Sequence, residues 1–353
     1  MNRLIFSNNV SEEIDKSVKE LQPGGVFVLV DVNSRSFVLP RLQAESQAVA
    51  NATIIEIKSG DINKTVETAS IVWQKLLDGG ATRKSLLINI GGGVVTDLGG
   101  FAAATFKRGI RFINVPTTLL SAVDASVGGK TGVNLGNFKN QVGVFKNADY
   151  VIVSSTFFNT LNSQELYSGY AEMIKHGLLE SEKELGQVLR ERPDEISPER
   201  MLALLKNNVL IKKSIVDRDP EEQGLRKVLN LGHTAGHAFE SLAMSRKLPI
   251  AHGYAVAYGV VTELVLSSRL LGFPSVDVTK VSTVVRECYP GFTFDCDDYS
   301  TLLRFMQADK KNDEASRINF TLLRRVGEPV TDCIVDTEAI KEGFDITRDL
   351  LGI

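Results

Sequence analysis

Residues 85–100 read SLLINIGGGVVTDLGG, an apolar run that leads directly into a glycine turn and opens a helix. A short apolar run bounded by glycine predicts a buried strand. Glycines let the backbone approach a phosphate closely, and a helix N-terminus offers free N–H groups to an anion. The stretch therefore predicts a strand, a tight turn and a helix that together suit a nucleotide.

The glycine turn differs from two familiar phosphate-binding fingerprints. Thr96 stands where the third glycine of G-x-G-x-x-G would be, and no G-K-[ST] follows, as a P-loop requires. The alternative interpretation is a plain turn of any α/β protein. Asn33 and Asp61 each follow the end of a predicted strand and are candidate partners for a ribose or a base, although either alone also fits a simple turn residue.

Strand-like and helix-like segments alternate on both sides of this turn. Such alternation predicts a parallel sheet with helices on both faces, and ligands of such sheets bind beyond the carboxyl ends of the strands. The predicted strands are residues 25–32, 52–57, 85–90, 111–115 and 150–153, and residues 65–77 have the apolar spacing of a helix.

The pattern becomes almost entirely helical after Phe157. The predicted helices are residues 163–179, 198–218, 234–243 and 253–271, and a short strand is expected near 318–324. We therefore expect an N-terminal α/β nucleotide-binding domain (1–158) with a parallel sheet and a mostly α-helical C-terminal domain (159–353). The active site is expected in the cleft between them.

Composition excludes several classes of protein. A formal net charge of -3 over 353 residues argues against a general binder of nucleic acid or of a membrane surface. Cys288, Cys296 and Cys333 are widely spaced without a C-x-x-C, which is typical of a reducing compartment. Residues 251–271 are too polar for a membrane span, and residues 1–10 lack the apolar run of a signal peptide. We expect a cytoplasmic protein.

Histidines gather in the second half of the chain. His233 and His237 are four residues apart in NLGHTAGHAFE (230–240), so a helix would place both on one face, and His252 opens the next predicted helix. Glu172 lies in an apolar helical segment. One carboxylate and two imidazoles with an open position are typical of a catalytic zinc site. Spacing alone leaves open which two of the three histidines bind, and His176 is a further candidate.

Several cations accompany these residues. Lys130 lies in an uncharged, glycine-rich stretch, and Lys175, three residues after Glu172, faces the same side of its helix. Cations beside a metal suit an acidic, phosphorylated substrate, whereas any one of them alone fits a solvated surface residue. The others near glycines or helix ends are Arg108, Lys139, Lys212, Arg226, Lys310 and Lys311.

These motifs together resemble the 3-dehydroquinate synthases, of the sugar-phosphate cyclase group. The resemblance covers nearly the whole chain, and several long motifs in the right order are far more specific than one short pattern. The stretches that carry it are residues 91–100, RGIRFINVPTTLLSAVDASVGGKTGVNLGNFKN (108–140), GYAEMIK (169–175), GLRKVLNLGHTAGHAFE (224–240), His252-Gly253 and DKKN (309–312).

The resemblance implies a set of site residues. It assigns Glu172, His233 and His252 as ligands of Zn2+, with Co2+ as an alternative, and His237 beside them. The implied NAD contacts are Asn33, Ser59, Gly60, Asp61, Ile62, Asn63, Lys64, Gly93, Val94, Val95, Thr96, Asp97, Thr117, Thr118, Lys130, Lys139, Phe157, Phe158, Asn159 and Thr160. The implied substrate contacts are Arg108, Asp124, Lys130, Asn140, Lys175, Lys212, Arg226, Asn230, His237 and one of Lys310 or Lys311. The implied catalytic roles fall to Lys130, Lys175, Asn230 and His237.

The reaction of the family converts 3-deoxy-D-arabino-heptulosonate 7-phosphate to 3-dehydroquinate and phosphate, a step of the shikimate route. NAD takes a hydride from C5 and later returns it, so there is no net redox change. A C5 ketone acidifies the C6 proton, which allows elimination of phosphate, and a phosphate oxygen of the substrate can accept that proton. Reduction, ring opening and an intramolecular aldol closure follow. The resemblance also implies a homodimer.

Three positions depart from the family pattern, and three other functions compete. Phe138 replaces a usual glycine before Lys139, Ala125 replaces a serine, and Tyr254 stands where glutamate is common.

The alternatives are another sugar-phosphate cyclase, a metal-dependent polyol dehydrogenase of the glycerol dehydrogenase type, and a non-enzymatic, metal-stabilised regulator. The last would have a closed metal shell without a water position.

Overall fold

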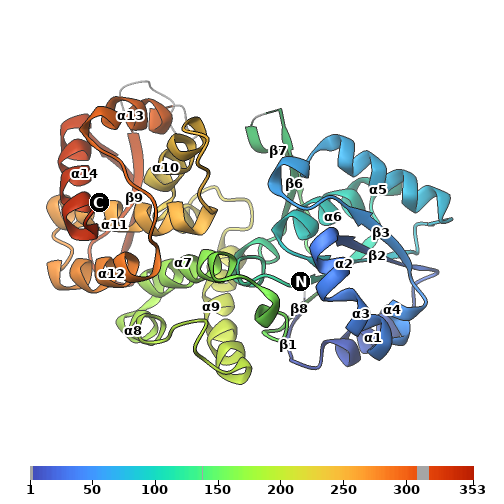
Figure 1. Ribbon diagram of the computed structural model, residues 1–353. Helices are drawn as coiled ribbons and strands as arrows, with labels where there is room; N and C mark the ends of the chain where they lie inside the picture. The colour runs from blue at the N-terminus through green and yellow to red at the C-terminus, as the bar shows by residue number, and fades with distance from the viewer. Residues whose placement is uncertain (1–2, 137, 308–317) are drawn as a thin grey trace. The chain divides into compact units, whose positions relative to one another are not determined.

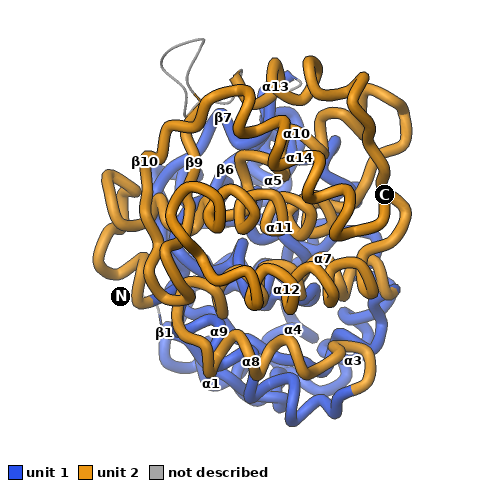
Figure 2. The backbone as a smooth tube through the Cα atoms, turned by 90° about the vertical axis from the view of Figure 1, so that its left-hand side faces the viewer, with its two compact units in different colours: residues 1–162, 196–213 blue, residues 163–195, 214–353 orange. Residues whose placement is uncertain are grey.

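The computed structural model describes residues 3–136, 138–307 and 318–353, and the chain divides into two compact units (Figure 2). Unit 1 contains residues 1–162 and 196–213, and unit 2 contains residues 163–195 and 214–353. Lys310 and Lys311, one of which is a predicted substrate contact, lie outside the described residues.

Unit 1 is built on a six-stranded sheet whose paired strands are all parallel, which confirms the predicted α/β fold (Figure 1). Its strands are β1 (Arg3–Phe6), β2 (Val26–Asp31), β3 (Thr53–Ile57), β4 (Leu86–Gly91), β5 (Arg111–Pro116) and β8 (Tyr150–Val153). Their order is β1-β8-β5-β4-β2-β3. The continuous apolar runs of β2 and β4 suit strands that are covered on both faces.

The register of the sheet brings the predicted nucleotide segments to one edge. Gly91 at the end of β4 is paired with Pro116 at the end of β5, and the Thr117 N–H donates to the Gly91 carbonyl over 3.0 Å. The turn at Gly92 and the Thr117-Thr118 pair therefore leave the sheet side by side, at the edge where parallel sheets bind ligands.

Helices and a hairpin complete unit 1. They are α1 (Val10–Leu21), α2 (Val32–Phe37), α3 (Leu39–Glu45), α4 (Gln47–Ala50), η1 (Asp61–Asn63), α5 (Val66–Asp78), α6 (Gly93–Thr105), η2 (Phe106–Arg108), η3 (Ser121–Ala125), η4 (Phe158–Thr160) and the antiparallel pair β6 (Lys130–Leu135) and β7 (Phe138–Phe145). The sequence did not predict β1 or the β6–β7 hairpin. β6 and β7 hold glycine and polar residues, and β7 is mostly exposed, so neither shows the apolar run of a buried strand.

Unit 2 is mainly helical, as expected. Its elements are α7 (Ser163–Glu180), α8 (Glu182–Arg190), the end of α9 (Pro198–Arg218), η5 (Leu225–Asn230), α10 (His233–Ser245), α11 (His252–Leu271), α12 (Ser275–Cys288), η6 (Cys296–Asp298), α13 (Tyr299–Gln307), α14 (Thr337–Leu351) and the antiparallel strands β9 (Ile318–Leu323) and β10 (Pro329–Val335).

Helix α11 is the core of unit 2 and packs against α7, α10, α12 and α14. It is long and apolar enough to be compared with a membrane span, but 78% of its most apolar window is buried inside the protein. Burial on all sides explains why the helix is apolar all round. The helix predicted over residues 253–271 is therefore confirmed, and it begins one residue earlier, at His252.

The division into units is not contiguous in the sequence, unlike the predicted boundary after residue 158. Residues 196–213, placed by the sequence in the C-terminal domain, group with unit 1, so helix α9 belongs to both units. Polar contacts within unit 1 explain this grouping. The Ser155 hydroxyl donates to the Pro198 carbonyl over 2.6 Å, and the Lys212 ammonium donates to the Asp124 carboxylate over 2.7 Å.

Candidate active site

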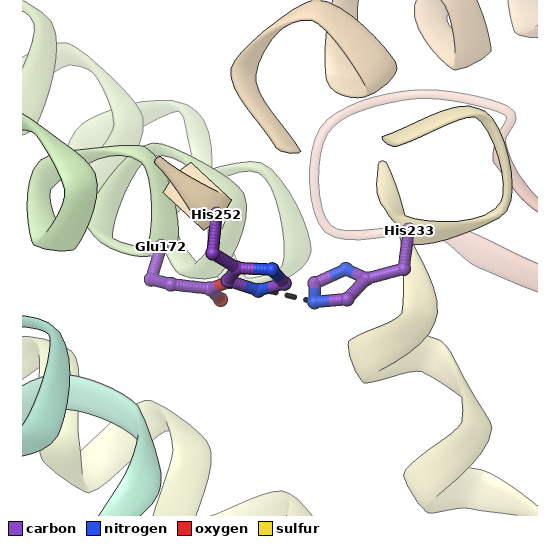
Figure 3. A group of neighbouring side chains, drawn as sticks. All are labelled: Glu172, His233 and His252. Carbon is purple, nitrogen blue, oxygen red and sulfur yellow. Dashed lines mark ion pairs between the residues drawn. The ribbon is translucent and has the colours of Figure 1, made fainter. Parts of the chain in front are cut away.

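Three ligand-type side chains converge inside unit 2 from three elements. Glu172 lies in the middle of α7, His233 begins α10 and His252 begins α11. Their ligand atoms all lie within 4.8 Å of one another. The Nε2 atoms of His233 and His252 lie 3.4 Å and 3.8 Å from Glu172 Oε1. Figure 3 shows both imidazoles turned toward the carboxylate.

The Glu172 carboxylate has the surroundings of a metal ligand. Its side chain is fully buried, and neither oxygen accepts a hydrogen bond from the described residues. Its charged neighbour on the same helix is Lys175, whose ammonium forms an ion pair with Oε2. Among the described residues, Oε1 is left without a hydrogen bond as a buried, negatively charged oxygen, which is costly. A divalent cation held between Oε1 and the two imidazole nitrogens fits this donor set.

Each imidazole has a partner for its other nitrogen. His233 Nδ1 lies 3.1 Å from the Leu231 carbonyl, to which its N–H donates. His252 Nδ1 faces the Glu240 carboxylate at 3.6 Å. Partners at Nδ1 hold the proton there and leave the Nε2 lone pair for a metal.

Close helix contacts explain why the three elements meet. The Gly253 N–H donates to the Ser168 hydroxyl over 3.0 Å, and a Cβ at Gly253 would lie 2.0 Å from the Ser168 carbonyl oxygen. A Cβ at Gly259 would likewise lie 2.0 Å from the Gly232 carbonyl oxygen. The two glycines therefore let the backbone of α11 come into van der Waals contact with the backbone of α7 and with that of α10.

The glycine turn of unit 1 has the geometry of an anion site. Gly92 is the N-cap of α6 and has no side-chain capping bond, so the N–H groups of the first turn point out of the helix end. A Cβ at Gly91 would lie 2.5 Å from the Val95 side chain, and one at Gly92 would lie 3.2 Å from Thr118. Glycine is therefore required for the close packing of this turn.

A polar network in unit 1 joins three of the predicted cofactor or substrate segments. Lys64 is buried, and its ammonium lies 3.1 Å from Asp97 Oδ2 and 2.7 Å from Asn140 Oδ1. Burial raises the pKa of the Asp97 carboxyl, and the Lys64 charge opposes that shift. Segments from η1, α6 and β7 are thus held together by one ammonium.

Comparison with known proteins identifies the family. Residues 54–168 match the model of the 3-dehydroquinate synthase N-terminal domain, and residues 169–312 match that of the C-terminal domain. The chain is 44% identical over 99% of its length to 3-dehydroquinate synthase of Parabacteroides distasonis, 99% of which is covered. This chain belongs to the 3-dehydroquinate synthase family.

Solved structures share the fold at lower identity. One is 2-deoxy-scyllo-inosose synthase complexed with carbaglucose-6-phosphate, NAD+ and Co2+, with a TM-score of 0.86, 22% identity, and coverage of 98% of this chain and 96% of that one. Another is 2-epi-5-epi-valiolone synthase from Streptomyces hygroscopicus with NAD+ and Zn2+ bound, with a TM-score of 0.84, 22% identity, and coverage of 99% and 97%. This chain therefore shares its fold with these two synthases.

The second imidazole of the H-x-x-x-H pair, that of His237, lies beside the ligand group. The ring of His237 is 5.4 Å from that of His233 and 6.0 Å from that of His252. Glu172, His233 and His252 form a group that could hold a metal ion, so His233 and His252 stay the predicted pair of imidazole ligands, although Glu172 and His176 also belong to a second such group. His176, the other candidate, is buried on α7.

The predicted cations of unit 2 lie in buried positions. Lys175 is 1% exposed and Arg226 is 2% exposed, which is rare for charged side chains without a function or a partner. The Arg226 guanidinium donates to the Pro220 carbonyl over 2.6 Å. Asn230 ends η5, two residues before the N-cap of α10. All three therefore belong to the same unit as the ligand group.

Of the predicted substrate residues of unit 1, one lysine is buried and hydrogen-bonded, whereas two other cations are exposed. Lys212 is buried and donates to both the carboxylate and the carbonyl of Asp124, over 2.7 and 2.5 Å. Lys130 on β6 and Arg108 in η2 are exposed.

Arg108 has φ of 68°, and Asn140 has φ of 52°, conformations that non-glycine residues seldom adopt. Strain of this kind is concentrated at functional sites.

The remaining predicted cofactor residues lie at strand ends. Asn33 is exposed on α2, directly after β2, and Lys139 forms an ion pair with Asp61 over 3.4 Å. The Phe157 and Phe158 side chains are buried in unit 1, so the turn after β8 offers backbone groups rather than aromatic faces.

Two acidic residues near the ligand group were missed by the sequence analysis. Glu240 faces His252, and Glu263 binds the first turn of α10. Glu240 could have been found, because His233, His237 and Glu240 follow the i, i+4, i+7 spacing of one helix face. Glu263 had no such signal, since its partners are backbone groups of another helix.

Proposed function

We propose that this chain catalyses the reaction of its family, the conversion of 3-deoxy-D-arabino-heptulosonate 7-phosphate to 3-dehydroquinate and phosphate, as a metal- and NAD-dependent carbon–oxygen lyase. The observation that carries the proposal is Oε1 of the Glu172 carboxylate, which is buried without a hydrogen bond from the described residues and faces two imidazole Nε2 atoms. The 44% identity to a 3-dehydroquinate synthase over 99% of the chain supports it.

The proposed cofactors are NAD and Zn2+, with Co2+ as an alternative ion. When bound, the metal supplies Lewis acidity toward substrate hydroxyls, and NAD supplies a reversible hydride acceptor. Glu172, His233 and His252 would hold the metal, and the N–H groups of Gly93, Val94 and Val95 at the start of α6 would bind a cofactor phosphate. The Lys64 network would keep the segments around the cofactor in place.

Buried positive charges in unit 2 suit a substrate that carries phosphate and carboxylate groups. The Lys175 and Arg226 side chains are held in the low-dielectric interior of unit 2, where a positive charge attracts an anion more strongly than in water. We infer that they bind the phosphate or carboxylate of the substrate. Lys212 and Asn140 of unit 1 are further proposed substrate contacts. Such cations would stabilise charge that develops on the departing phosphate. His237, beside both metal-binding imidazoles, would bind the substrate and move protons.

The same proposal covers the assembly and the location of the protein. We infer a homodimer in the cytoplasm, acting on a small phosphorylated sugar acid and not on nucleic acid or membranes. The formal net charge of -3 is consistent with a small-molecule enzyme of this kind.

In the test, the full chain is supplied with 3-deoxy-D-arabino-heptulosonate 7-phosphate, NAD and Zn2+. The release of phosphate and the formation of 3-dehydroquinate are measured over time. Glu172→Gln, which keeps the shape but removes the charge, should lower the rate by roughly 100-fold or more. Glu180→Gln, at the exposed end of the same helix, is the matched control and should retain full activity. Activity lost to a chelator should return with Zn2+.

Two results would overturn the proposal. One is product formation that neither chelation nor Glu172→Gln reduces. The other is stoichiometric accumulation of NADH with a polyol and no release of phosphate, which is the behaviour of a dehydrogenase.

A further inference from the structure

A second buried carboxylate, Glu263, binds the start of the helix that carries His233. Glu263 lies on α11 and has no exposed surface. Its Oε2 accepts the Gly232 N–H over 2.6 Å, and its Oε1 accepts the N–H groups of Thr234 and Ala235 over 3.1 and 3.2 Å. Three backbone donors therefore converge on one carboxylate.

These donors belong to the N-cap and the first turn of α10. The first bond within the helix runs from the Gly236 N–H to the Gly232 carbonyl over 3.1 Å, so the N–H groups of residues 232–235 have no partner inside the helix. Glu263 accepts three of these four. Its negative charge also complements the positive end of the helix dipole.

The residue at the N-cap cannot supply this cap itself. Gly232 has φ of +80°, and a Cβ there would lie 2.5 Å from Val260 and 3.1 Å from the Val256 carbonyl oxygen. Serine, threonine and aspartate, the usual N-cap residues, are therefore excluded from this position. The cap comes from another helix instead.

We propose that Glu263 is a positioning residue of the metal centre, an inference that rests on the proposed metal-binding function of Glu172, His233 and His252. It acts through the turn at residues 231–233. The Gly232 N–H is held by Glu263, the neighbouring Leu231 carbonyl accepts the His233 Nδ1–H over 3.1 Å, and His233 Nε2 is thereby aimed at Glu172. The same side chain fixes α10 against α11, which carries His252.

The chemistry of the contact requires a carboxylate. Glutamate offers two acceptor oxygens, and both are used by N–H donors. Glutamine offers one oxygen, and its NH2 group would face one of the donors, so Glu263→Gln keeps the volume and loses the cap. Aspartate keeps the two oxygens on a shorter side chain, so Glu263→Asp should retain part of the effect.

A buried residue on the same helix provides a matched control. The Ser267 hydroxyl lies one turn after Glu263, is fully buried, and accepts the Leu323 N–H over 3.0 Å. Ser267→Ala removes two buried hydrogen bonds, the one from Leu323 and one that the hydroxyl donates to the Glu263 carbonyl over 2.6 Å, and leaves the Glu263 carboxylate and the first turn of α10 untouched. It therefore measures how far a general loss of stability alters metal binding.

The experiment measures Zn2+ affinity of the metal-stripped full chain by competition with a chromophoric chelator, and the absorption spectrum of the Co2+ form. Glu263→Gln should weaken Zn2+ binding by about 10- to 100-fold, as loss of a positioning contact does in other metal sites. It should also change the Co2+ absorption bands, because His233 is displaced. Ser267→Ala should leave affinity and spectrum unchanged, Glu263→Asp should fall between, and NAD affinity should stay within about twofold in all variants.

The outcomes separate this inference from the function on which it rests. Zn2+ affinity that depends on Glu172 but is equal in Glu263→Gln and Ser267→Ala would overturn the positioning role alone. Zn2+ affinity that Glu172→Gln leaves unchanged would overturn the metal site and the positioning role together. If Glu263→Gln does not fold, Glu263→Asp decides, since an affinity and spectrum equal to wild type would contradict the proposal.

Discussion

The carboxylates around the ligand group differ in what each one touches. Glu172 meets imidazole nitrogens, Glu240 faces the far nitrogen of His252, and Glu263 binds backbone N–H groups. A carboxylate at Nδ1 of a metal-binding histidine fixes the ring and raises the basicity of Nε2. The two outer carboxylates therefore act on different histidines.

Glu240→Gln removes the charge that faces His252 Nδ1 at 3.6 Å. We expect Zn2+ affinity to fall by about tenfold, because the imidazole becomes a weaker donor while its position is largely kept. The measurement is chelator competition on the metal-stripped chain. Glu328→Gln, an exposed carboxylate of the same unit, is the control, and equal affinities of the two variants would contradict this role.

At the scale of elements, the ligand group depends on how closely three helices pack. Gly253 lies against Ser168, and Gly259 lies against Gly232, so α11 makes backbone contact with both α7 and α10. No side chain fits between these backbones. The glycines at these helix contacts thus determine how far apart the Glu172 and His252 side chains lie.

Gly253→Ala should separate the start of α11 from α7, because the new Cβ would lie 2.0 Å from the Ser168 carbonyl oxygen. We expect a loss of about 1–3 kcal/mol in unfolding free energy, together with weaker Zn2+ binding. The measurements are urea unfolding and chelator competition.

The matched control is Gly186→Ala in α8, where a Cβ would meet only the end of the Arg190 side chain at 3.9 Å. Alanine in an open helix position should leave stability unchanged or raise it by about 0.5–1 kcal/mol. Equal behaviour of the two variants would show that close approach at Gly253 is not required.

The loop before η5 carries a pH-dependent contact. Backbone N–H groups of Arg226, Gly224 and Gln223 donate to the Asp219 carboxylate and hold its pKa below the usual value. A lowered pKa means that the contact stabilises the folded protein above the ordinary pKa of aspartate, about 3.9, and that this stabilisation is lost as the pH falls through the lower folded value.

Asp219→Asn should therefore be less stable than wild type at pH 7 and approach it as the pH falls below about 3.9. The measurement is the difference in unfolding free energy between the two proteins across a pH series. A difference that stays constant with pH would contradict the role of the carboxylate charge. Asp349→Asn, on the exposed side of α14, serves as the control.

At the scale of the molecule, each unit carries its own set of candidate ligands. The proposed metal ligands all lie in unit 2, and the glycine turn with the Lys64 network lies in unit 1. A ligand that binds only the folded state stabilises the part that binds it, by about 2.7 kcal/mol at a hundredfold excess over Kd. Zn2+ and NAD should therefore act on different segments.

Hydrogen exchange of the full chain distinguishes the two effects. Zn2+ should slow exchange in α7, α10 and the start of α11, whereas NAD should slow exchange at the start of α6 and in η1. The Zn2+ effect should disappear in Glu172→Gln and the NAD effect should remain. A Zn2+ effect of equal size in Glu172→Gln would place the metal elsewhere.

The sequence by itself determined the class of fold and the types of side chain that are candidates for binding a metal. Continuous apolar runs predicted five strands of the sheet, and apolar spacing predicted the helices that became α7, α9, α10 and α11, because these signals are local and repeat with the period of the element. The spacing of His233 and His237 placed two imidazoles on one face for the same reason.

Tertiary structure alone decided which groups meet. The pairing of His233 and His252 with Glu172, the cap that Glu263 supplies to α10, and the grouping of residues 196–213 with unit 1 all depend on contacts between residues far apart in the chain. A periodic pattern reports the face on which a side chain lies, but not the partner that packs against it. That partner is set by how closely helices approach, here at glycines whose missing Cβ leaves no mark in an apolar pattern.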